Sequence, residues 1–262
     1  GGANSAADTG YDVDNSCRFN AGDSAYMTRT FGSAGNRRTW TFSTWCKRAK
    51  FGAQQTLFGT SSDGSNYHLK LYVNGASVGS GSYPSEDAEM ILNNNVRCDV
   101  GSSGAHFTSH MLGGYLAETV FIDGTQYAAS DFGEYDEDSP TIWKPKDVSE
   151  LTFGTNGFWF DYEASGTLGN DANGGTDWTA TNLAATDQTT DTPTNNFAVA
   201  NPLQAHADTT FDEGNTRTRQ LSSANALIYG ISTIGVAKGK WYMEFKHVTN
   251  DNDSLYGITT DP

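Results

Sequence analysis

The chain has 262 residues, enough for one large domain or two ordinary ones, each with its own core. Its formal net charge of −15 argues against nucleic acid as a partner, because phosphate contacts require clustered Lys and Arg. No apolar run approaches the roughly 20 residues of a membrane-spanning helix and no signal peptide is recognisable, so we expect no membrane insertion. Aromatic residues make up 12% of the chain and Gly occurs 29 times, which favours many short strands joined by tight turns around an aromatic-rich core.

The first 164 residues show the alternation of β-strands. Residues 16–30 alternate loosely, and in "WTFSTWCKR" (40–48) the side chains of Trp40, Phe42 and Cys46 share one face. Strands are predicted at 67–73, before an Asn-Gly turn, and at 115–122, before an Asp-Gly turn and a short return strand. Alternating aromatics predict a hairpin-like element at 151–164, and "AASDFGEYD" (128–136) has room for one short turn of helix. Cys17 and Cys46 occupy apolar positions, so both are expected to be small buried side chains.

The second part of the chain changes in character at about residue 165. Residues 165–205 are rich in Gly, Asn, Asp and Thr, which predicts a long connecting segment pinned at Trp178 and Phe197. Strands are predicted again from residue 219, and "GKWYMEFKH" (239–247) places Trp241, Met243 and Phe245 on one face of a half-buried strand. So few strands cannot close a sandwich core. We therefore expect 206–262 to be an incomplete β-sandwich, completed by residues beyond 262 or by another subunit.

Seven phrases add a resemblance to this pattern. In order they are "SCRFNAGDSAYMTRTFGSAGNRRTWTFSTWCKR", "LKLYVNG", "GGYLAETVFIDG", "DFGEYDED…IWKPK", "FGTNGFWFDY", "LGNDANGGTDWTATN" and "DTPTNNF". Together they resemble a family of tailed-bacteriophage virion proteins that carry a laminin-G-like (concanavalin A-like) jelly roll, in many members followed by a SPRY-like β-sandwich. One departure is the short spacer "SSDGSNYH" after Thr60, where the family has several more strands.

The resemblance implies an all-β architecture with three parts: a jelly-roll β-sandwich at 1–164, a connecting segment at 165–205, and the N-terminal part of a SPRY-like β-sandwich at 206–262. It also implies a structural protein of the virion, assembled with other virion proteins. Fibres are usually symmetric, so a homo-oligomer is expected and a trimer is favoured.

An acidic stretch, "FGEYDEDSPTIWKPK" (132–146), raises three alternatives: catalytic carboxylates, a calcium site or a solvated loop. Its carboxylates are Glu134, Asp136, Glu137 and Asp138. Laminarinase-type jelly rolls use Glu-x-Asp-x-x-Glu on one strand, but here the spacing differs and Pro140 follows at once, which disfavours a continuous strand. We expect a solvated loop. Calcium remains an alternative, with Asp136 and Asp138 supplying two of the six to eight oxygens required.

No other motif indicates catalysis or a cofactor. The five histidines, His68, His106, His110, His206 and His247, lack the spacing of a zinc protease, and the cysteines lack metal-ligand spacing. Nucleophile elbow, phosphate-binding loop and dinucleotide fingerprint are all missing. We therefore expect a protein that is not an enzyme and that holds no cofactor or metal, apart from the calcium alternative.

Aromatic side chains in polar surroundings are candidates for stacking on sugar rings. They are Tyr83, Trp143, Trp159, Tyr162 and Trp178. Because Trp40, Trp159 and Trp241 lie in alternating strands, a core position is the more typical reading for these three. Trp143, Trp178 and Tyr162 remain the glycan-contact candidates.

The leading hypothesis is a structural virion protein in a tail fibre or appendage that contacts host-surface polysaccharide without cleaving it. A capsid or tail decoration (cement) protein with no ligand is the main alternative. A polysaccharide depolymerase and a free-standing bacterial lectin are the remaining ones.

Overall fold

The computed structural model describes residues 10–60, 72–78, 87–103, 110–220, 230–248 and 256–258. The chain divides into two compact units, Gly1–Phe197 (unit 1) and Ala198–Pro262 (unit 2). Strands are the main regular secondary structure of the described residues, and the helices among them are single 3-10 turns, at Ala21–Asp23, Ala129–Asp131, Ala185–Asp187 and Glu213–Asn215. The predicted all-β fold class is confirmed. In the described part of the chain no helix has the length and apolarity needed to cross a membrane.

The first sheet of unit 1 is built around β8 (Gly114–Asp123), all ten residues of which are buried. β3 (Trp40–Arg48) pairs antiparallel with β8 along one edge. On the other edge, β1 (Ser16–Phe19) pairs with the start of β8 and β11 (Phe158–Phe160) pairs with its second half. β13 (Gln188–Thr189) continues this sheet beyond β1.

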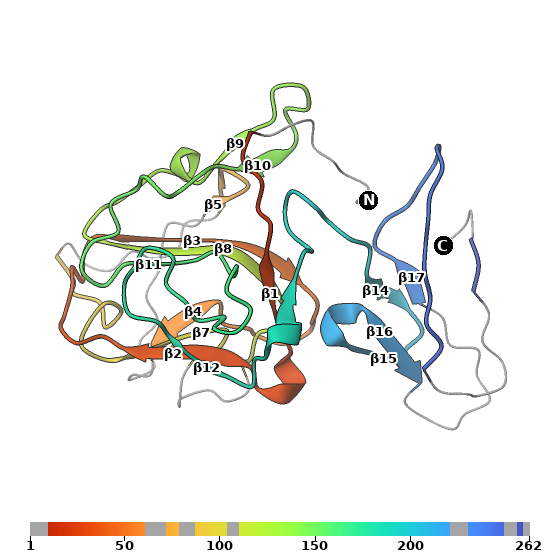
Figure 1. Ribbon diagram of the computed structural model, residues 1–262, viewed down its shortest axis with the longest axis horizontal. Helices are drawn as coiled ribbons and strands as arrows, with labels where there is room; N and C mark the ends of the chain where they lie inside the picture. The colour runs from red at the N-terminus through yellow and green to blue at the C-terminus, as the bar shows by residue number, and fades with distance from the viewer. Residues whose placement is uncertain are drawn as a thin grey trace. The chain divides into compact units, whose positions relative to one another are not determined.

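The second sheet of unit 1 has the order β12–β2–β7–β4, with β12 at Thr179–Thr181, β2 at Tyr26–Thr30, β7 at Arg97–Val100 and β4 at Phe58–Thr60. Figure 1 shows it as a layer facing the first sheet. One core fills the space between them, with Phe19, Phe121 and Phe158 from the first sheet and Met27 and Val100 from the second. Unit 1 is therefore a β-sandwich with an aromatic-rich core.

A β-bulge lies in the middle of β8. The pairing with β3 shifts between Ser43 and Trp45, and Glu118 has a positive φ of 46°. Leu116 and Phe121 are five residues apart, so a regular strand would place them on opposite faces, yet both belong to the main core. The extra residue at the bulge restores the inward direction of both side chains.

The outer face of the first sheet has a smaller apolar cluster of its own. Val120 and Ile122 of β8 pack there against Phe132, Val148 and Phe153 from the chain that follows β8. Residues 127–153 therefore cover the second half of β8, while the bulge lies beside this cover.

Two hairpins match the turn signals in part. β5 (Tyr72–Val73) and β6 (Ala76–Ser77) flank an Asn-Gly turn with positive φ at both turn residues, as predicted, whereas 67–71 lie outside the described residues. Gly124 makes the predicted turn after β8, but no return strand forms, and the chain enters the 3-10 turn Ala129–Asp131. The hairpin-like element predicted at 151–164 is the single strand β11, because β8 provides its ladder partner.

Residues 165–197 differ from the predicted connecting segment. β12 and β13 are strands of the two sandwich sheets, and Trp178 is 2% exposed in the main core. Phe197, by contrast, is 39% exposed and ends unit 1. The polar composition of this segment reflects its tight turns rather than a separation from the sandwich.

Cys17 is fully buried as predicted, but Cys46 is exposed. Cys46 shares the core-facing side of β3 with Phe42, yet it lies toward the strand's end, beside an open pocket lined by Gln55 and Leu57. The prediction for Cys46 was wrong because alternation shows which face of a strand a side chain lies on. It does not show how much of that face is covered by the core.

Unit 2 consists of two short antiparallel pairs among the described residues. β14 (Ala200–Ala205) pairs with β17 (Gly230–Ser232), and β15 (Thr209–Asp212) pairs with β16 (Arg217–Gln220). The strand predicted at 239–247 does not form, and Trp241, Met243 and Phe245 are each about half exposed. The alternation in this segment has no ladder partner among the described residues, which explains the failure of the prediction.

Candidate binding site

The acidic stretch at 132–146 is a hairpin rather than a free loop. β9 (Gly133–Tyr135) pairs with β10 (Trp143–Pro145), and Glu134 lies 3.6 Å from the Lys144 ammonium. Asp136 is buried, contrary to the solvated loop expected, and its Oδ1 accepts hydrogen bonds from the amides of Asp138 and Ser139. These bonds close the turn.

No calcium site is assembled in this hairpin. Asp136 Oδ1 is engaged by the turn amides, and its Oδ2 lies 3.9 Å from Lys144 Nζ. Asp138 is exposed. Among the described residues no group of three or more His, Cys, Asp or Glu side chains has an arrangement that would hold a metal ion.

Two of the three predicted glycan contacts are core residues. Trp178 packs against Phe158 and Phe160, and Tyr162 is 1% exposed, with its hydroxyl 2.8 Å from Thr119 Oγ1. Neither side chain is accessible to a glycan. Their polar sequence neighbours belong to turns at the rim, which explains why both were mistaken for surface residues.

Trp143 is partly exposed on β10. Its indole packs edge-on to Tyr135 at 4.9 Å, and there is no room for a Cβ at Gly75 or Gly133 beside it. The two glycines therefore let two hairpins close on the ring. Tyr83, His68 and His106 lie outside the described residues.

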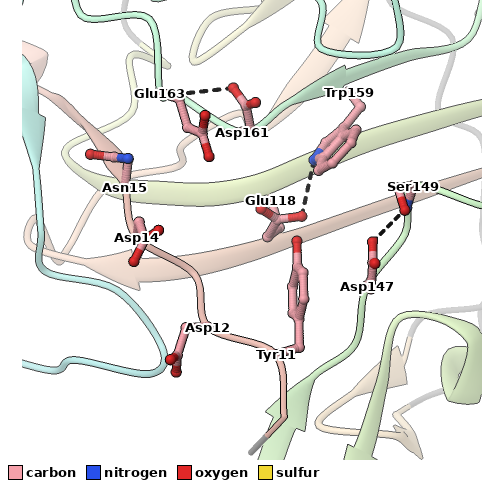
Figure 2. A pocket seen from close by; sticks show the side chains of 10 residues that line it. All are labelled: Tyr11, Asp12, Asp14, Asn15, Glu118, Asp147, Ser149, Trp159, Asp161 and Glu163. Carbon is pink, nitrogen blue, oxygen red and sulfur yellow. Dashed lines mark hydrogen bonds between the residues drawn. The ribbon is translucent and has the colours of Figure 1, made fainter.

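A different part of unit 1 forms a cavity of about 260 Å³ that the sequence did not reveal. Figure 2 shows the ten side chains that line it, which come from four separate segments. They are Tyr11, Asp12, Asp14, Asn15, Glu118, Asp147, Ser149, Trp159, Asp161 and Glu163. Trp159, which the sequence placed among the sugar-stacking candidates but favoured as core, is one of them.

The ladder of β8 explains why the cavity forms at this place. β1 pairs with β8 up to Leu116, and β11 pairs with it from Thr119 onward. Because both strands are antiparallel to β8, the start of β1 and the end of β11 meet at the bulge residue Glu118. The chain before β1 and the chain after β11 diverge there and leave a gap beside the carboxylate.

Glu118 is the most buried of the lining carboxylates. It is 6% exposed, its Oε2 accepts a hydrogen bond from the Trp159 indole nitrogen at 2.9 Å, and the Tyr11 hydroxyl also donates to it. Burial raises the pKa of Glu118 from 4.5 to about 7, opposed by these two hydrogen bonds and reinforced by the charges of Asp161 and Asp147. The Glu118 carboxyl group therefore gains and loses its proton near neutral pH.

Two further lining carboxylates, Asp147 and Asp161, are held by local turns. Asp147 Oδ1 accepts from the Ser149 amide at 2.8 Å, and Asp161 Oδ1 accepts from the Glu163 amide at 3.1 Å. Burial, together with the charges of Glu118, Asp147 and Asp161, raises the pKa of the Tyr11 phenol, which stays neutral as a donor.

Trp159 is held both at its backbone and at its ring. Its amide donates to Asp171 Oδ1 at 3.0 Å, and its ring stacks on Phe153 with centroids 6.4 Å apart. The indole is thus held in place before any ligand enters, which lowers the entropic cost of binding.

Besides Trp159, the sequence signal for this site was one charged residue inside an apolar run, Glu118 in "GYLAETVFID". The alternation of side chains along β8 does not show to which face the Glu118 side chain points, because the bulge shifts the alternation at that residue. Chemically the cavity offers carboxylate acceptors for hydroxyl or ammonium groups, an indole wall, and one carboxyl group that can act as an acid near neutral pH.

No protein-family model matches the chain, and the comparisons with curated proteins and with solved structures likewise found no significant match.

Proposed function

We propose that the chain is a structural protein of a tailed-phage virion, in a tail fibre or appendage, and that unit 1 binds a host-surface glycan in the cavity at Glu118. The virion setting is supported by the seven ordered phrases that resemble such proteins. The all-β sandwich is compatible with it, although fold alone does not determine function.

The observation that carries the binding function is the convergence of an indole and several carboxylates on one small cavity. Trp159 supplies an apolar wall, and carboxylates such as Glu118 and Asp161 accept hydrogen bonds from hydroxyl groups. The volume is slightly below the range of about 300–1,000 Å³ typical of small-molecule sites, so it suits one sugar residue of a longer chain.

Two measurements test this proposal. Mass spectrometry of purified virions should detect the chain, and absence from the particle would overturn the virion role. On a glycan array of host-surface polysaccharides, binding should be lost in Trp159→Ala and Asp161→Asn and retained in Tyr135→Ala. Tyr135 is an exposed aromatic residue outside the cavity and serves as the matched control. A virion protein without glycan binding would instead be a decoration or cement protein. Glycan binding that both cavity variants leave unaffected would place the binding site elsewhere and overturn the role of the cavity.

One observation favours a second candidate, glycoside hydrolysis. A buried glutamate with a pKa near 7 beside other carboxylates has the character of a general acid. Release of reducing ends from host polysaccharide, abolished in Glu118→Gln while glycan binding persists, would establish it. Polysaccharide that stays intact after prolonged incubation would exclude hydrolysis and leave binding as the only function of the cavity.

A further inference from the structure

The charge of the cavity indicates which glycans it takes. Six of its ten lining side chains are carboxylic acids: Asp12, Asp14, Glu118, Asp147, Asp161 and Glu163. None of the described residues that line it is Lys, Arg or His. The wall also has an indole, whose face attracts cations.

Cations close by in sequence are engaged elsewhere. Lys146 precedes Asp147, but its Nζ donates to the Ser130 carbonyl at 3.1 Å. Arg18 follows the lining segment 11–15, but its guanidinium pairs with Asp187 at 3.0 Å. Within the described part of the chain, neither the lining nor these two neighbouring cations balances the carboxylates, so solvent ions or a ligand can do so.

The carboxylates also act on one another. The charges of Asp161 and Asp147 contribute to the upward shift of the pKa of Glu118, and all three raise that of Tyr11. A positive group in the cavity would relieve this repulsion, whereas an acidic sugar would add to it.

Resting on the glycan-binding function proposed above, we propose that the cavity selects a sugar residue with a free amino group, bound as its ammonium ion, over neutral and acidic sugars. The ammonium group donates charge-assisted hydrogen bonds to the carboxylates and lies against the Trp159 indole. N-acetylation of the same sugar removes the positive charge and with it the preference.

Calorimetry with two oligosaccharides of one backbone tests the proposal. The full chain is titrated with a chitosan tetramer, which bears free amines, and with a chitin tetramer, which is N-acetylated. The pH is mildly acidic, so that the amines of the chitosan tetramer are charged. We expect the chitosan tetramer to bind at least about tenfold more tightly in low salt, and this advantage to shrink in about 0.5 M NaCl.

Variants assign the preference to the cavity. Asp161→Asn and Asp14→Asn should weaken binding of the chitosan tetramer several-fold more than they weaken binding of the chitin tetramer. Glu137→Gln makes the same charge change at an exposed residue outside the cavity, and it should alter neither. If Glu137→Gln has the same effect as Asp161→Asn, net charge rather than the cavity causes the preference, and the proposal is overturned.

The outcomes separate this inference from the function on which it rests. Equal affinity for both tetramers, lost in Trp159→Ala, would overturn the amine preference and leave glycan binding intact. No affinity for either tetramer or for any host glycan would overturn both. Titration with CaCl₂ alone is the last arm: tight calcium binding that Asp161→Asn abolishes would make the cavity an inorganic cation site and overturn the amine proposal.

Discussion

Asn93 Nδ2 lies 2.6 Å from Asp123 Oδ1 in the interior of unit 1, and both side chains are buried. Asp123 Oδ2 accepts from the Asn156 amide at 3.1 Å, and Asn156 Nδ2 donates to Asn93 Oδ1 at 2.9 Å. The three residues form a closed triangle of hydrogen bonds, one of them from the Asn156 backbone amide, that joins the end of β8 to two loops. Gly35 has no room for a Cβ beside it.

Removal of the Asp123 carboxylate should destabilise unit 1 strongly. Asp123→Ala leaves the buried donors of Asn93 and Asn156 without this acceptor, at a cost of about 1–3 kcal/mol for each group, and it also removes the part-buried bond from the Asn36 amide. We expect a total loss of about 3 kcal/mol or more in the free energy of unfolding, measured by urea denaturation. The turn residue Asp131 is the control: its carboxylate accepts an exposed hydrogen bond from the Ala128 amide, so Asp131→Ala should cost only about 1 kcal/mol. Equal effects of the two variants would show that the triangle contributes little.

The end of unit 1 depends on Lys47. Its Nζ lies 2.7 Å from Asp191 Oδ2 and also donates to Asn196 Oδ1 and to the Phe197 carbonyl. Lys47→Ala leaves the buried Asp191 carboxylate without its cation, so we expect a loss of about 1.5–3 kcal/mol. Thermal and urea unfolding would measure it.

Arg38 provides the comparison for Lys47. Its partners Asp87 and Glu89 are exposed, so Arg38→Ala should cost no more than about 1 kcal/mol. If Arg38→Ala destabilised the chain as much as Lys47→Ala, the burial of Asp191 would not explain the loss of stability in Lys47→Ala.

Glu118 makes stability depend on pH. Its pKa is raised on folding from 4.5 to about 7, so the folded state holds the proton more tightly than the unfolded state. This contribution is fully present below about pH 4.5 and is lost as the pH rises through 7. Wild type should lose on the order of 3 kcal/mol relative to Glu118→Gln between these limits, as an upper value. Urea unfolding of both proteins across this pH range measures the difference, and parallel profiles would contradict the prediction.

Core and cavity aromatics should respond differently to substitution. Tyr162→Phe removes a buried hydroxyl from its contact with Thr119 and should cost about 1 kcal/mol while glycan binding stays unchanged. Trp159→Phe keeps an aromatic ring but removes the donor to Glu118, so it should lower glycan affinity more than it lowers stability. Binding assays paired with denaturation separate the two effects. Loss of glycan binding in Tyr162→Phe would contradict this assignment and support the original prediction that Tyr162 contacts the glycan.

Sequence patterns predicted the fold better than the site, for physical reasons. Strands β3 and β8 and the Asn74-Gly75 turn follow from alternation and turn chemistry, which are local properties. Trp178 was misjudged because its neighbours are polar turn residues, while its burial depends on Phe158, which is distant in the chain. Glu118 was missed because its place depends on a bulge and on where two other strands end, neither of which is encoded near it.

Because β1 and β11 meet at Glu118, most of the residues that line the cavity can vary in sequence without affecting the sheet. Of the ten residues around the cavity, only Glu118 and Trp159 belong to strands, and the others lie in chain that enters or leaves the sheet. Those eight positions can be exchanged without changing a residue of the main core. Substitution at these positions would therefore change the chemistry of the cavity wall and leave the framework of the sandwich unaltered, as in antibody loops on a constant framework.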